Sequence, residues 1–270
     1  PMTTGMAMPA VVAIHGGPWT RDLGGFEADT QFLANRGYAV VQINFRGSTG
    51  LGRKTFEAGV GQFGRAMSDD IDGVVLRLIK EGILDGDRVC LLGGSYGGYA
   101  SLMGLARGTV RYRCGIDYAG PTDLSTLINA FPPSWQPYLP RSWYRFVGNP
   151  ANAEQKKIMD AHSPVYLASR IQSPLLIFQG LNDPRVRKDQ SDAIVCSLRS
   201  RGIDVDYLLA TNEGHSFANE ETHLAVNLAV EAFLARHLGG RTQQEATTSA
   251  RTALNQLLVA GKAQLVCPGS

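Results

Sequence analysis

The sequence has little excess charge of either sign and no long hydrophobic run. Lys and Arg total 26, Asp and Glu total 24, and the formal net charge is +2. No dense block of Lys and Arg is present, which argues against a nucleic-acid partner. The longest apolar runs, such as 11–14 and 175–178, fall far short of the roughly 20 residues that a membrane-spanning helix needs. We therefore expect a soluble globular protein that binds neither nucleic acid nor membrane.

Cysteine is also scarce, with four residues in 270. So few do not make the disulfide framework of a small secreted domain. Cys90 and Cys114 lie in apolar strand-like segments, Cys196 in a predicted helix and Cys267 near the C-terminus. We predict four free thiols and a cytoplasmic location. The apolar stretch 6–14 has no basic residues before it, which argues against an export signal.

Motifs for metals, nucleotides and repeats are missing as well. The chain contains no H-E-x-x-H, no paired C-x-x-C and no P-loop. The glycine-rich run 47–52 lacks the spacing and the preceding strand of a dinucleotide-binding fingerprint. No internal repeat is present, so neither a propeller nor a solenoid is encoded. We expect no cofactor and no metal ion.

What the chain does contain is material for a sizeable core, with 44% hydrophobic residues. Its length suits one large α/β domain or two small ones. Apolar runs rich in β-branched residues alternate with longer amphipathic stretches, which is typical of βαβ units around a parallel sheet. The predicted strands are 10–14, 38–44, 88–92, 114–118, 174–179 and 205–210. The predicted helices are 26–36, 69–81, 97–107, 188–201 and 220–237.

Two segments interrupt this alternation. Segment 121–162 is rich in proline and aromatic residues, and a structureless loop of that length is unusual in a compact domain. We therefore predict a small helical cap over the sheet there. After Gly240 a polar run leads into a short helix near 250–258. The predicted organisation is a main domain over 1–240, which includes the cap, and a tail over 241–270.

Ser95 is the candidate nucleophile. It is the serine of a G-x-S-x-G motif that runs from Gly93 to Gly97, with a predicted strand before it and a predicted helix after it. The glycines are needed because a sharp strand-to-helix turn strains the serine and brings neighbouring chains close. An ordinary glycine turn is the alternative, and the strand–turn–helix context disfavours it. We expect Ser101, inside the following helix, to be structural.

A serine nucleophile needs a base, and the base needs an orienting carboxylate. Asp183 directly follows the predicted strand 174–179, and His215 lies just past the strand 205–210. Both positions fall at the carboxyl edge of the sheet, where such folds bind ligands. Asp123 is the rival acid, one strand earlier. We interpret His15 as bracing its own loop through hydrogen bonds, and His162 lies at the end of the cap segment. His223 and His237 are interpreted as surface positions on the last main helix. The remaining acids are interpreted as helix-start or strand-edge charges, namely Asp189, Asp192, Asp204 and Asp206.

An oxyanion hole is expected next to this serine. The backbone N–H of Tyr96, the residue after the nucleophile, is one predicted donor. The loop His15-Gly16-Gly17-Pro18 is similar to the glycine loops that supply the other donor in such enzymes. A plain turn is the alternative interpretation of this loop.

Together these motifs resemble the catalytic domain of the prolyl oligopeptidase family of serine peptidases. The matching segments are HGGP at 15–18, NFRGSTG at 44–50, GGSYGGY at 93–99, NDPRV at 182–186 and EGH at 213–215. They extend over roughly 9–240 and favour the acylaminoacyl-peptidase branch. The resemblance implies an α/β-hydrolase fold. It also implies Ser95 as nucleophile, Asp183 as acid and His215 as base, with oxyanion donors from Tyr96 and Gly17.

The chain departs from this family at its N-terminal end. We expect the sequence to start close to the natural start of the chain. It contains no β-propeller segment, and 10–14 already corresponds to the third strand of the hydrolase sheet. We therefore expect the first two strands to be absent and the strand 38–44 to lie at an unprotected edge. Either the tail helix or a second subunit is expected to cover the apolar surface near this edge. In the second case the chain forms a homo-oligomer. Family exopeptidase specificity is not carried over.

The predicted function is cleavage of peptide or acyl-peptide bonds through an acyl-enzyme, with a small peptide or ester as substrate. A carboxylesterase acting on small esters is the alternative, because the same triad serves both reactions. A non-catalytic interaction module is a third hypothesis, which the complete set of motifs disfavours. Four aromatic residues of the cap either line an apolar acyl pocket or form the core of the cap, namely Trp135, Tyr138, Trp143 and Tyr144.

Overall fold

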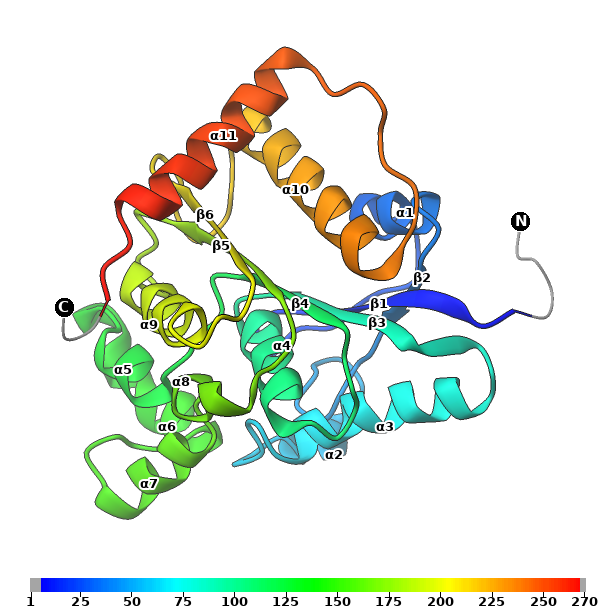
Figure 1. Ribbon diagram of the computed structural model, residues 1–270. Coiled ribbons are helices and arrows are strands. Elements are labelled where there is room, and N and C mark those ends of the chain that lie inside the picture. Colours follow the sequence, from blue (N-terminus) through cyan, green and yellow to red (C-terminus); the bar gives the residue numbers. More distant parts are fainter. Residues whose placement is uncertain (1–5, 268–270) are drawn as a thin grey trace.

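The computed structural model describes residues 6–267 and centres on a six-stranded sheet in which all paired strands are parallel. The strands lie in the order β2-β1-β3-β4-β5-β6. Their bounds are Met8–Ile14 (β1), Ala39–Gln42 (β2), Leu84–Gly94 (β3), Cys114–Tyr118 (β4), Leu175–Gly180 (β5) and Val205–Ala210 (β6). All six predicted strands are therefore present (Figure 1).

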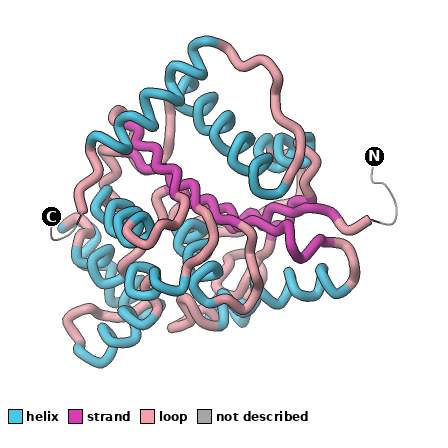
Figure 2. The backbone as a smooth tube through the Cα atoms, viewed as in Figure 1, coloured by secondary structure: helices cyan, strands magenta, loops and turns pink. Residues whose placement is uncertain are grey.

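Helices cover both faces of this sheet (Figures 1 and 2). One face carries α1 (Ala28–Asn35), α10 (Glu220–Leu238) and α11 (Thr248–Ala263), and the other carries α3 (Ala66–Lys80), α4 (Tyr96–Arg107) and α9 (Lys188–Arg199). Successive strand residues point to opposite faces, so Val11 joins one buried cluster and Val12 the other. Because both faces are buried, the strands read as nearly continuous apolar runs. The predicted α/β-hydrolase architecture is confirmed.

The cap is also confirmed as a set of short helices. It contains α5 (Leu124–Asn129), the 3-10 helix η1 (Pro133–Arg141), α6 (Trp143–Phe146) and α7 (Ala153–Ala161). Three further short helices escaped prediction because they are too short to show a helical period, namely α2 (Arg53–Glu57), α8 (Pro164–Leu167) and η2 (Ala168–Arg170).

The tail helix does not lie where the sequence suggested. α11 packs against β6 and α10, at the opposite end of the sheet from the edge strand β2 (Figure 1). Gly261 makes this close contact feasible, since a Cβ at that position would overlap the backbone carbonyl of Tyr207 in β6. The prediction that this helix covers the edge at β2 is therefore wrong.

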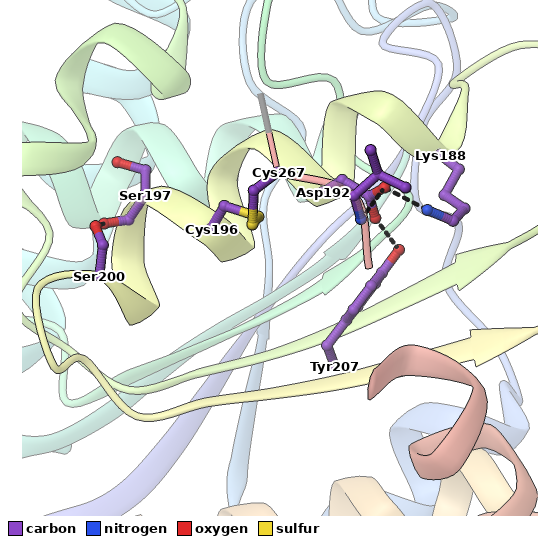
Figure 3. Close-up of a disulfide and its surroundings, with 8 residues drawn as sticks. Lys188, Asp192, Cys196, Ser197, Ser200, Tyr207 and Cys267 are labelled. Atoms are coloured by element: carbon purple, nitrogen blue, oxygen red, sulfur yellow. Dashed lines mark hydrogen bonds and ion pairs between the residues drawn. A yellow bond between two sulfur atoms is a disulfide. The ribbon is translucent and has the colours of Figure 1, made fainter. Parts of the chain in front are cut away.

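The prediction of four free thiols is wrong too, because the structure pairs all four cysteines. Cys90 of β3 lies opposite Cys114 of β4 in the sheet, with their Cα atoms 4.7 Å apart. Cys196 of α9 meets Cys267 beyond the end of α11, with a Cα separation of 5.6 Å (Figure 3). Separations of 24 and 71 residues concealed both contacts in the sequence. The cytoplasmic expectation thereby loses the free thiols on which it rested.

Among residues 6–267, no helix combines the length and the hydrophobicity needed to cross a membrane.

Candidate active site

Ser95 occupies a strained turn between β3 and α4. Its φ is 56°, in the left-handed region that non-glycine residues rarely adopt. A Cβ on Gly93 would collide with the backbone of Gly97, and a Cβ on Gly97 would collide with the carbonyl of Ile14. The Ser95 N–H donates to the Tyr118 carbonyl at 2.8 Å, which fixes the turn against the end of β4. The motif glycines are thus explained by close backbone packing around the serine.

Asp183 and His215 are hydrogen-bonded to each other. Asp183 follows β5 and is buried, and its Oδ1 accepts the N–H groups of Arg185 at 2.8 Å and Val186 at 2.9 Å. Its Oδ2 lies 2.6 Å from Nδ1 of His215, in the loop after β6. The carboxylate therefore orients the ring and leaves Nε2 of His215 available for another partner.

Glu213 braces the loop that carries His215, a role that the sequence analysis did not assign. Its buried carboxylate accepts the N–H groups of Ala218 at 2.9 Å and Asn219 at 3.0 Å. Burial disfavours the charged form of Glu213, but these hydrogen bonds outweigh burial and lower its pKa. The position two residues before the histidine, inside the quoted EGH segment, was the available signal.

Ser95, Tyr96, His215 and Gly17 line a single cavity of about 340 Å³, which we call the front pocket. The structure thus brings together the predicted nucleophile, the predicted base and both predicted oxyanion residues. The rest of the lining is mainly apolar, apart from Arg185, and comes from the loops after β1 and β5, the segment before α3, α4 and the cap. Its apolar members include Trp19, Phe63, Tyr99, Leu124, Leu127, Phe131 and Val186. The sequence analysis did not identify these residues, because they come together only in the fold.

The four aromatic cap residues divide into two pairs. Trp135 and Trp143 line the front pocket. Tyr138 is 71% exposed on the surface of the cap, and Tyr144 packs beside the hydrophobic core outside the pocket lining. Only the two tryptophans are therefore placed to touch a substrate in the front pocket.

The HGGP loop is held rigidly beside the turn of Ser95. The His15 ring stacks on Phe45 with centroids 4.4 Å apart, and its Nε2 lies 3.0 Å from the Ser48 hydroxyl. The predicted bracing role of His15 is thus observed. A Cβ on Gly16 would lie only 3.0 Å from the carbonyl of Gly94, so this glycine permits the loop to approach the turn. Residues 44–49, which carried only a family resemblance in the sequence, supply the partners of this loop.

The competing residues have other roles in the structure. Asp123 caps α5, where its Oδ1 accepts the N–H groups of Ser125 and Thr126. Ser101 is buried and donates to the Gly97 carbonyl, as expected of a structural serine. Asp192 differs from prediction because it is a buried side chain that accepts a hydrogen bond from Tyr207, not a solvated charge at the start of a helix.

Comparison with known proteins finds similar sequences along most of the chain. Residues 25–241 match the model of the prolyl oligopeptidase family. The dipeptidyl aminopeptidase BIII of Pseudoxanthomonas mexicana is 44% identical over 236 residues, which cover 87% of this chain and 34% of the relative. The human acylamino-acid-releasing enzyme is 26% identical over 235 residues, covering 86% of this chain and 32% of the relative.

The solved structures give the same result. A puromycin-hydrolyzing peptidase of Mycobacterium tuberculosis superposes with a TM-score of 0.81 and 29% identity, over 89% of this chain and 35% of that one. An acylaminoacyl peptidase at 24% identity and a TM-score of 0.79 shares the fold. The chain thus spans about a third of the length of the curated relatives it matches.

Proposed function

Because this chain belongs to the prolyl oligopeptidase family, we propose that it is a serine peptidase whose catalytic residues are Ser95, Asp183 and His215. The observation that carries the proposal is the 2.6 Å contact between Asp183 Oδ2 and His215 Nδ1, beside a pocket that Ser95 also lines. A histidine held in this way can accept the proton of a serine hydroxyl through its Nε2. Family membership agrees with the resemblance that the motifs predicted.

The reaction proceeds in two steps. The Ser95 Oγ attacks the substrate carbonyl as its proton moves to His215, and the resulting oxyanion accepts hydrogen bonds from the N–H groups of Tyr96 and Gly17. His215 then gives this proton to the leaving amine, and an acyl-enzyme remains. Water attacks the acyl group while His215 takes its proton and returns it to Ser95. Asp183 supports the positive charge that His215 carries between the two transfers.

The front pocket determines which acyl group fits. Its lining is mainly aromatic and aliphatic, and includes Trp135 and Trp143 of the cap together with Val186. Burial of apolar surface in such a pocket favours substrates whose attacked carbonyl belongs to an apolar residue. The relatives bear the names of peptidases, which favours an amide bond over an ester as the natural target.

A labelling experiment tests the mechanism. A fluorophosphonate probe is expected to label the parent protein and Ser101→Ala, but not Ser95→Ala. Ser101 is the matched control because it lies six residues away in α4 and donates to a backbone carbonyl. Absence of label on the folded parent protein would favour the interaction-module hypothesis and overturn the proposal.

Kinetics on paired substrates tests the reaction class. Peptide anilides and p-nitrophenyl esters with the same apolar acyl group are compared for kcat/KM. Turnover of the anilide that is lost in Ser95→Ala supports a peptidase. Turnover of the ester alone would make the carboxylesterase the better description of the same site.

A further inference from the structure

A second cavity of about 260 Å³ shares His215 with the front pocket, and we call it the rear cavity. It is bounded by α1, the end of β4, the loop after β6 and α10. His215 lines both cavities, whereas Ser95 and Tyr96 belong to the lining of the front pocket alone. The base of the proposed triad is therefore shared by two cavities.

The rear cavity has apolar walls and a polar rim. Its walls include Phe32, Leu92, Tyr118, Phe217, Val226 and Val230. Asp29 and His223 contribute at the rim, and both are exposed. Burial raises the pKa of the Tyr118 hydroxyl, and the Asp29 carboxylate raises it further. A compact apolar group with a positive charge near Asp29 matches these walls and this rim.

Tyr118 links the rear cavity to the nucleophile as well. Its side chain lines the cavity, and its carbonyl accepts the N–H of Ser95 at 2.8 Å. The adjoining Ala119, with φ 47°, also lines the cavity and donates its N–H to the Phe178 carbonyl. The wall of the rear cavity thus includes both His215 and Tyr118, whose carbonyl holds the backbone of Ser95.

We propose that the rear cavity is a leaving-group subsite, which binds an apolar side chain on the amine side of the scissile bond and favours a positive charge next to it. The inference rests on the proposed function, because a leaving group exists only if an acyl bond is cleaved at Ser95. His215 must reach the leaving nitrogen to protonate it. With the acyl side chain in the front pocket, we place the leaving residue toward the rear cavity, because His215 lines both cavities.

A series of internally quenched peptides tests the apolar preference. The acyl side is held constant while the first leaving residue is Gly, Ala, Leu or Phe. We expect kcat/KM to be about tenfold or more higher for Leu or Phe than for Gly, because burying such a side chain gains this much transition-state binding. A second pair places Arg or Glu after an apolar leaving residue, and Arg is expected to be favoured by about two- to fivefold.

Three variants assign these preferences to the cavity. Asn227→Trp places a large ring in the lining and is expected to remove the advantage of Leu and Phe. Leu224→Trp is the control, because Leu224 lies on the same helix, is 42% exposed and is not part of the lining. Asp29→Asn is expected to abolish the preference for Arg over Glu and to leave that for Phe over Gly. Circular dichroism and thermal melting establish that each variant is folded.

Acyl transfer separates this inference from the proposed function. During hydrolysis of an ester, phenylalanine amide competes with water for the acyl-enzyme. Its amine forms an amide bond with the acyl group, the ester bond to Ser95 breaks, and His215 passes the amine proton to the Ser95 oxygen. In the parent protein, phenylalanine amide should capture more of the acyl group than glycine amide does. In Asn227→Trp, the two amides should capture equally small amounts. The subsite would be overturned, and the proposed triad retained, by three results together. The parent protein would capture both amides equally, the probe would label Ser95, and kcat/KM would not vary with the first leaving residue. Failure of Ser95 to react would overturn both.

Discussion

Asp183 and His215 lie 32 residues apart in the sequence, yet Oδ2 of one and Nδ1 of the other are 2.6 Å apart. Parallel pairing of β5 with β6 sets this distance, because Gly180 lies opposite Ala210 and the two loops leave neighbouring strand ends. The loops are joined further by the Asn182 N–H, which donates to the Glu213 carbonyl at 3.0 Å. The two side chains are therefore positioned by backbone contacts as well as by their own hydrogen bond.

Asp183→Asn is expected to lower kcat by about 10³- to 10⁴-fold, because an amide favours the wrong tautomer of His215 and gives its cation little support. Steady-state hydrolysis of an activated ester measures the loss. Asp123→Asn is the matched control, since Asp123 caps α5 with two hydrogen bonds. This control should keep its activity and lose at most about 1 kcal/mol of stability. A large loss in Asp123→Asn and a small one in Asp183→Asn would exchange the two assignments.

The strands and the meeting of Asp183 with His215 were predictable because their signals are local. A buried parallel strand is a short apolar run, and a nucleophile turn is five residues between a strand and a helix. The acid and the base each follow a predicted strand directly, so the sheet topology alone brings them to one edge. Sequence order and elementary sheet geometry were sufficient for these features.

The features that were missed depend on segments that meet only after folding. Nothing near Cys267 indicates that it meets Cys196, and nothing near Gly261 indicates that α11 packs on β6. Likewise, Ser48 carries no motif of its own for the bond with the His15 ring. The second cavity beside His215 was also invisible in the sequence, because its walls come from four separate segments of the chain.

Gly97→Ala is expected to destabilise the fold by about 1–3 kcal/mol or more, because the new methyl group would overlap the carbonyl of Ile14. Gly73→Ala should instead stabilise it by about 0.5–1 kcal/mol. Gly73 is an exposed position inside α3 where a Cβ meets nothing within 4 Å, and alanine has the higher helix propensity. Denaturant unfolding of both variants measures the two changes. Equal effects would contradict the tight packing assigned to the nucleophile turn.

Cys267→Ser is expected to lower the free energy of unfolding by up to about 4 kcal/mol, the chain-entropy value for a closed loop of this size. The loop between Cys196 and Cys267 contains β6, His215, α10 and α11, so the bridge constrains the whole segment that carries the base. A reducing agent should abolish the difference in stability between parent and variant, because it opens this bridge in the parent and the Cys90–Cys114 bridge in both proteins. Unfolding curves that coincide for parent and variant under oxidising conditions would show that the bridge does not stabilise the fold.

Asp117 is expected to make the stability of the fold depend on pH. The side chain is fully buried in β4, its Oδ1 accepts the Gly120 N–H at 2.7 Å, and its Oδ2 has no partner among the described residues. Burial raises the pKa of Asp117 from 3.8 to about 7, against the smaller opposite effect of the Gly120 bond. Because the folded protein holds this proton more tightly than the unfolded chain, stability is greatest below pH 3.8 for this group and falls as pH rises to about 7.

Asp117→Asn should therefore remove this component of the pH dependence. A shift of this size corresponds to on the order of 4 kcal/mol between the two ends of the window. Urea denaturation from pH 4.5 to 8 measures the unfolding free energy of both proteins. The variant is expected to gain stability relative to the parent as pH rises, and this gain is expected to level off above about pH 7. The isosteric amide retains the packing of Asp117 Oδ1 against Gly98 and Gly120. A difference in unfolding free energy that is the same at every pH would therefore mean that Asp117 is already charged in the folded protein.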